Sequence, residues 1–293
     1  MSTETQRPSQ PRGAVRRLLA MGGFDPLFRG AVWLLVLLIG VTLAGQLAGV
    51  GGAPDATVGQ RLSPPSGELP LGTDNLGRSV LPRLLQGVGT TLLLSSAAVL
   101  CTALISTALG IVAGYRGGRT AGLIMRLGEV LYSFPAIVLA VLVAAVIGPG
   151  RIAALASIVL VTVPLMTRMV GTAARSVAQR DFVVAARISG VPTTTIMRRH
   201  VLSNVSGTIA VHGTYALSVG ILVEGGLSFL GYGVQLPDAS LGLLIQEGSL
   251  YMVNAPWLIV APGVVLVAAI VSINLIGDSL RDRFEPRETR SLT

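Results

Sequence analysis

The stretch GAVWLLVLLIGVTLAGQLAGV, residues 30–50, contains no charged side chain. Coiled as an α-helix, 21 residues rise about 31 Å, which matches the hydrocarbon core of a bilayer. A cleaved signal peptide has a shorter apolar region of about 7–15 residues. The stretch therefore predicts an uncleaved first transmembrane helix.

Five further apolar runs follow, at residues 91–114, 130–147, 152–167, 201–223 and 257–277. Hydrophobic residues make up 51% of the 293-residue chain and charged residues only 12%, against about 25% charged in a soluble domain. The composition and the spacing of these runs predict an all-α integral membrane protein with six transmembrane helices. It would be a multi-pass protein in contact with lipid.

The arginines indicate the orientation, because basic residues gather in cytoplasmic loops. All 22 basic residues are arginine. With both termini cytoplasmic, 18 of them fall inside, and only Arg61, Arg78, Arg83 and Arg151 fall outside. The inside residues are Arg7, Arg12, Arg16, Arg17, Arg29, Arg116, Arg119, Arg126, Arg168, Arg175, Arg180, Arg187, Arg198, Arg199, Arg281, Arg283, Arg287 and Arg290.

This orientation assigns the segments between the spans. Residues 1–29 and 278–293 become cytoplasmic ends, and the proline-rich loop 51–90 becomes extracytoplasmic. The transmembrane unit 91–277 contains a cytoplasmic loop at 171–200 and an extracytoplasmic loop at 224–256. Within 224–256, the glycine-punctuated run 225–233 is too short to cross, and we expect a re-entrant or interfacial turn there.

The sequence excludes several kinds of chemistry. With no lysine, the chain cannot form a P-loop or a Schiff base. Cys101 is the only cysteine and the histidines are two, His200 and His212, so a metal cluster is not expected. No HExxH or GxSxG pattern is present. We expect no catalytic, cofactor-binding or metal-binding residue and no nucleic-acid partner.

The loop 171–200 has the features of a docking knob. The apolar positions 182, 183, 186 and 188 are expected to lie largely on one side of a helix that stops at Gly190. Pro192 would open a second short helix, Thr193 to His200, as its first residue. Two short amphipathic helices without a soluble domain of their own favour a partner groove over a solvated loop.

The run from Asp181 to Asn204 resembles the "EAA" loop of permease subunits in bacterial ATP-binding-cassette importers. Ala185, Ala186 and Gly190 match that pattern, whereas Val184 replaces the usual Glu and Ser203 the usual Pro. Residues 71–78 (LGTDNLGR) and 226–235 (GLSFLGYGVQ) resemble signatures of the dipeptide/oligopeptide/nickel class. Residues 274–282 and 285–287 resemble the end of its C-type (DppC/OppC-like) subunit.

The resemblance implies a type I permease fold, a location in the bacterial plasma (inner) membrane and a set of partners. These are a second, homologous permease subunit forming a heterodimer, two cytoplasmic ATPases or one fused ATPase, and an extracytoplasmic solute-binding protein. ATP and Mg²⁺ would be bound by the ATPases and not by this chain. The ATPase-coupling residues would be Asp181, Val184, Ala185, Ala186, Gly190, Pro192 and Ile196.

Three polar residues in or beside the spans are candidates for the translocation path: His212, Glu224 and Asn274. Hydrogen bonding between helices is the simpler explanation of His212 and Asn274. Glu224 could meet a peptide ammonium group or sit in the interface. A secondary transporter and a membrane enzyme are the rival readings, and the solute could be a dipeptide, a longer peptide, a nickel complex or haem.

Overall fold

The computed structural model describes residues 25–284, and the expectations for residues 1–24 and 285–293 lie outside that range. Over residues 25–284 the chain is helical and has no strand, only isolated bridges between Thr57 and Arg78 and between Thr73 and Ser79. The helices are α2 (Pro26–Leu47), α3 (Val80–Arg116), α4 (Gly118–Tyr132), α5 (Ala136–Ile147), α6 (Arg151–Ala178), α7 (Asp181–Ile188), α8 (Thr193–Thr195), the π-helix η2 (Ile196–Val201), α9 (Leu202–Phe229), α10 (Leu241–Ser249) and α11 (Trp257–Phe284).

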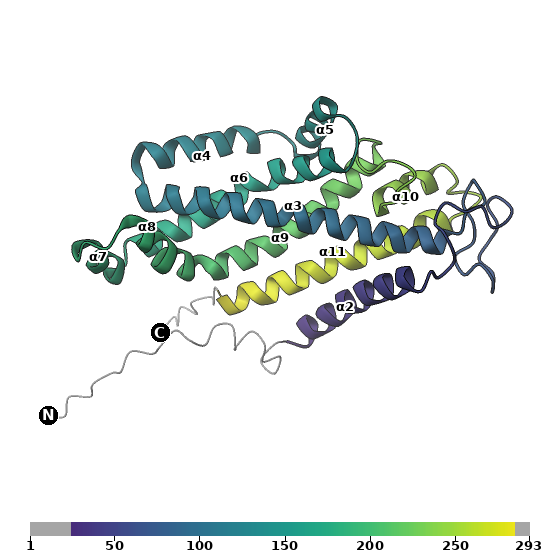
Figure 1. The fold of residues 1–293 in the computed structure, drawn as a ribbon, viewed down its shortest axis with the longest axis horizontal. Coiled ribbons are helices and arrows are strands. Elements are labelled where there is room, and N and C mark those ends of the chain that lie inside the picture. The colour runs from purple at the N-terminus through teal and green to yellow at the C-terminus, as the bar shows by residue number, and fades with distance from the viewer. Residues whose placement is uncertain (1–24, 285–293) are drawn as a thin grey trace, which may run out of the picture.

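The helices form one elongated bundle with different structures at its two ends (Figure 1). At one end, α7, α8 and η2 form a projection that we call the knob, residues 181–201. At the opposite end, which we call the loop end, lie residues 48–79 and 230–256, including α10. The α3 helix packs along α6 through the middle of the bundle, and α2 packs against α11.

The predicted membrane architecture is confirmed. Within residues 25–284, α2, α3, α6, the continuous helix Thr193–Phe229 and α11 are long and apolar enough to cross a bilayer. A sixth span is present if α4 and α5, which meet at an angle of 92°, together make one crossing. Pro135 precedes α5 and interrupts the helix there.

Several helix ends differ from the expected ones. The α3 helix begins at Val80 and not at residue 91, so part of the expected 51–90 loop is helical. The α6 helix continues past Arg168 to Ala178, so the expected 171–200 loop begins only after it. The ends of apolar runs were poor guides because an arginine can remain in a helix when its charge is paired, as that of Arg83 is, or when it reaches the polar boundary.

The segment after α9 also differs from the expected turn. Gly225 and Gly226 continue α9, and the turn begins only at Leu230. Gly242 of α10 is needed for packing, because a Cβ at that position would lie 2.7 Å from the Gly225 Cα. The short helix α10 therefore folds back directly against α9, as a piece too short to cross the bilayer should.

Candidate functional site

The corner of the knob is built around Gly190. Its φ of 75° lies in the left-handed region, which a glycine adopts without strain. Gly190 N–H donates to the Arg187 carbonyl and Val191 N–H to the Ala186 carbonyl, each at 3.1 Å. This pair of bonds is a Schellman motif. The predicted helix stop at Gly190 is confirmed, and Pro192 lies just before α8 as its N-cap.

The inner side of the knob is part of the bundle core. Val183, Ile196 and Val201 are each fully buried, against Val170 and Val177 of α6. Because η2 continues into α9, the knob is attached to both α6 and α9. Ile196, expected among the coupling residues, therefore anchors the knob from inside rather than presenting a surface.

The outer side of the knob exposes three large apolar side chains. Phe182 is 42% exposed, Val184 40% and Ile188 82%. The expectation that 182, 183, 186 and 188 share one side is wrong, because Val183 is buried while Phe182 and Ile188 point outward. The other expected coupling residues Asp181, Ala185, Gly190 and Pro192 are exposed, and Ala186 is half-buried.

Two ring contacts hold the outer side in place. The Arg187 guanidinium lies over the Tyr115 ring at the end of α3, 5.1 Å from the ring centre. The Phe182 and His200 rings lie 6.2 Å apart between centroids. A cation over an aromatic face contributes about 0.5–1 kcal/mol at an exposed site, so the knob is fixed mainly by its buried valines.

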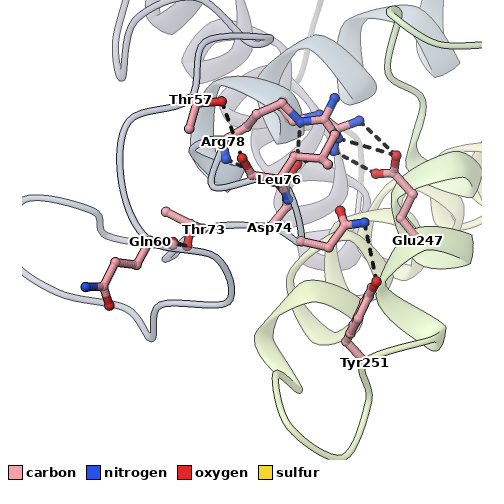
Figure 2. A network of polar contacts seen from close by, with 10 residues as sticks. Thr57, Gln60, Thr73, Asp74, Leu76, Arg78, Glu247 and Tyr251 are labelled. Atoms are coloured by element: carbon pink, nitrogen blue, oxygen red, sulfur yellow. Dashed lines mark hydrogen bonds and ion pairs between the residues drawn. The ribbon is translucent and has the colours of Figure 1, made fainter.

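At the loop end, the LGTDNLGR run builds a buried ionic network (Figure 2). Asp74 Oδ1 accepts hydrogen bonds from the backbone N–H groups of Leu76 (2.8 Å) and Arg78 (2.9 Å). Asp74 Oδ2 lies 2.6 Å from Arg78 Nε and 2.9 Å from an Arg83 guanidinium nitrogen. One carboxylate thus closes the turn and pairs with two arginines.

The same network reaches α10 through Glu247. Arg83 donates to both Glu247 oxygens, at 2.6 and 3.3 Å, and Arg78 lies 3.6 Å from Glu247 Oε1. Arg83 is 2% exposed, Asp74 4% and Arg78 7%. Two arginines and two carboxylates balance in charge, as burial requires. These ion pairs connect residues 74–83 to α10, and Arg83 and Glu247 are 164 positions apart in the chain.

Glu224 forms a second polar cluster near the loop end. It is fully buried and accepts hydrogen bonds from the hydroxyls of Thr91 (2.8 Å) and Ser228 (2.7 Å). The Thr91 hydroxyl in turn accepts from Leu241 N–H (3.1 Å), and the Ser228 hydroxyl from Val234 N–H (3.0 Å). The carboxyl therefore fastens α10 and its preceding turn to α3 and α9.

The three candidate path residues are not brought together. His212 is half-buried on α9, twelve residues and therefore about 18 Å along the helix from Glu224. Asn274 is exposed on α11. Glu224 reaches no open surface. In this conformation its burial favours a packing role between helices over contact with a solute.

Sequence reasoning missed the partners of these charges. Arg83 was counted only as an outside arginine and Glu247 was not considered, and Thr91 and Ser228 received no role. One signal was available: isolated charges inside apolar stretches must find partners. Arg83 in LPRLLQ and Glu247 in LLIQEG are such charges.

Comparisons with known proteins agree with this architecture. Residues 106–290 match the family model described as "Binding-protein-dependent transport system inner membrane component". The chain is 36% identical to a di/tripeptide transport system permease protein DppC of Pseudomonas aeruginosa, over 74% of this chain and 72% of that protein. It is 31% identical to a dipeptide transport system permease protein DppC of Haemophilus influenzae, over 88% and 91%.

Among solved structures, the chain resembles one from the MetNI methionine ABC transporter in an inward-facing conformation. The TM-score is 0.57, with 70% of this chain and 97% of that chain covered. At 19% identity this likeness concerns the fold. The expected importer permease fold is confirmed by it.

Proposed function

This chain belongs to the family of binding-protein-dependent transport system inner membrane components, and from that membership we propose that it carries di- and oligopeptides across the membrane together with a second permease subunit. It is a non-catalytic, multi-pass subunit of an ABC importer in the inner membrane, and ATPase and other subunits belong to the complex. The peptide solute is supported by the names of relatives that are more than 30% identical over most of the chain.

The observation that carries the coupling role is the two-sided knob. Its outer face presents Phe182, Val184 and Ile188, while its inner face is buried against α6 and runs into α9. An ATPase seated on the outer face would move both helices with the knob, because densely packed cores transmit displacement. ATP and Mg²⁺ would be held by the ATPases, whose closure changes the arrangement of the spans.

The transport role is tested by changing the outer face alone. Ile188→Asp places a charge where an apolar contact is expected, so ATPase co-purification and dipeptide uptake by the reconstituted complex should both fall at least about tenfold. Val253→Asp is the matched control, since Val253 is 90% exposed at the loop end. Normal uptake by the Ile188→Asp complex would remove the coupling role. Absence of peptide uptake by the unmodified complex would instead remove the peptide assignment.

The cytoplasmic placement of the knob and of both chain termini is part of this proposal, and it rests on the arginine distribution. In a chain lacking Cys101, a cysteine at Ser66 should react with an impermeant thiol reagent outside the cell. A cysteine at Thr194 should not, although both positions are exposed. Labelling of Thr194 but not Ser66 would reverse the orientation.

A further inference from the structure

A groove of about 860 Å³ lies between α3, α4 and α6, on the side of the bundle nearest the knob. Its walls are mostly apolar, with Leu109, Met125, Leu127 and Val163 among the lining residues. The volume lies within the range of about 300–1,000 Å³ typical of small-molecule sites. The groove includes no residue of the ionic network or of the Glu224 cluster, and it reaches the knob only at Arg187.

The α4 helix leaves this groove open. None of its residues is buried, and Leu123, Leu127 and Val130 are each at least 60% exposed. A Cβ on Gly122, which also lines the groove, would meet no atom within 4 Å. A helix exposing this much apolar surface inside a bilayer is in contact with lipid or protein.

The charges that line the groove distinguish between a lipid and a protein as its occupant. Three arginines line it, Arg168, Arg175 and Arg187, against one carboxylate, Glu129. Arg187 is engaged with Tyr115. Arg168 and Arg175 lie seven residues apart on α6, on one face and about 10 Å apart along the axis. In the described part of the chain, neither forms an ion pair with a carboxylate within 4.0 Å.

An occupant that fits must be apolar along α4 and anionic at α6. A transmembrane helix of the second permease subunit would cover the apolar wall, but it could pair with both arginines only by carrying acidic side chains, which are costly within a bilayer. An anionic phospholipid supplies acyl chains for the wall and a phosphate for the guanidinium groups, which bind phosphate oxygens in a bidentate manner. Basic pockets between transmembrane helices on the cytoplasmic side bind such head groups.

We propose that the α4 groove is a binding site for one anionic phospholipid, with its phosphate at Arg168 and Arg175 and its acyl chains along α4. The site gives α4 the packing partner that it lacks within the chain. It also places a lipid against α6, the helix on which the knob is anchored.

The test is native mass spectrometry of the full chain, titrated with phosphatidylglycerol and, separately, with phosphatidylcholine. One phosphatidylglycerol should bind at least about tenfold more tightly than phosphatidylcholine. Arg168→Gln with Arg175→Gln should abolish that preference. The control is Arg116→Gln with Arg119→Gln, which removes the same charge near the α3–α4 turn without touching the groove lining, and it should keep the preference.

A second variant tests the apolar wall without changing any charge. Gly122→Phe should fill the open groove and weaken phosphatidylglycerol binding, whereas Gly213→Phe, at an equally open helical glycine outside the groove, should not. Equal losses in the two arginine pairs would reduce the effect to general surface charge and overturn the proposal. So would a Gly122→Phe chain that binds phosphatidylglycerol normally but no longer retains the second permease subunit, because the groove would then be a subunit interface.

Discussion

The loop end and the knob are held to the same helical bundle by opposite kinds of interaction. At the loop end, two buried arginines pair with buried Asp74 and half-buried Glu247, and Glu224 accepts hydrogen bonds from Thr91 of α3 and Ser228 of its own helix. At the knob, buried valines and Ile196 provide the attachment, and Phe182, Val184 and Ile188 are exposed on the outer surface. Directional, charge-balanced contacts fix one geometry, whereas apolar packing depends mainly on area and tolerates small displacements.

This difference indicates which end of the bundle can be displaced without losing its contacts. A buried ion pair that opens leaves an unpaired charge, so the loop end should respond to force as a unit. The knob can shift together with α6 and α9 while its valines stay covered. One fixed end and one displaceable end suit a transporter on which the ATPases act from the knob side only.

Breaking the ionic network should cause the largest loss of stability. Arg83→Met leaves Asp74 and Glu247 short of one positive charge in a buried site, and the expected cost is about 3–5 kcal/mol. Thermal or denaturant unfolding in detergent measures it. Arg151→Met is the matched control, because the Arg151–Asp238 pair is equally short at 2.7 Å but largely exposed, and such pairs contribute about 0–1 kcal/mol.

A double variant sharpens this prediction. Arg83→Met combined with Glu247→Leu removes one charge of each sign and leaves the Asp74–Arg78 pair balanced. Much of the lost stability should return, since charge imbalance and not the missing contacts dominates the cost. If the double variant is as unstable as the sum of the two single ones, packing rather than charge balance holds the loop end.

Altering the Glu224 cluster should have a smaller effect. Glu224→Gln keeps the shape of the side chain but replaces one acceptor oxygen by a donor, so one of the hydroxyls of Thr91 and Ser228 loses its acceptor. The expected cost is about 1–3 kcal/mol. Hydrogen exchange should rise at residues 234–243, which that cluster fastens, and stay constant in the knob. Unchanged exchange there would assign the fastening of α10 to Gly242 packing and to the Arg83–Glu247 pair.

The knob should show the smallest loss of stability and the clearest loss of function. Gly190→Asp forces a left-handed backbone on a non-glycine residue at a cost of about 1 kcal/mol, and the Cβ itself meets open space. The protein should therefore insert and remain stable, yet lose peptide uptake and ATPase co-purification. Normal uptake with this variant would reduce the knob to a connecting loop.

A matched control exists at the loop end. Gly231 has a φ of 81° and equally open surroundings, so Gly231→Asp carries the same backbone cost away from the ATPase. Co-purification with the ATPase should persist in that variant. If Gly231→Asp also lost co-purification with the ATPase, backbone strain would explain the Gly190→Asp effect.

Features that depend on local chemistry could be predicted from the sequence. The spans follow from length and apolarity, and the stop at Gly190 follows from the preference of glycine for positive φ. The outward face of α7 was mispredicted because eight residues are too few for periodicity to fix a face. The Arg83–Glu247 pair joins positions 164 apart, so it depends on how α10 folds back, which no local pattern encodes.

The 92° break between α4 and α5 also bears on how the protein is made. The α4 helix, 15 residues long, measures about 22 Å, and the 12-residue α5 about 18 Å, so neither reaches across a hydrocarbon core of about 30 Å. The α4 helix also carries Arg119, Arg126 and Glu129, each costly at mid-bilayer. Neither helix alone is therefore long enough to be inserted as a complete span during synthesis. Both pack against α6, and these contacts can form only after α6, which follows them in the chain, has been synthesised.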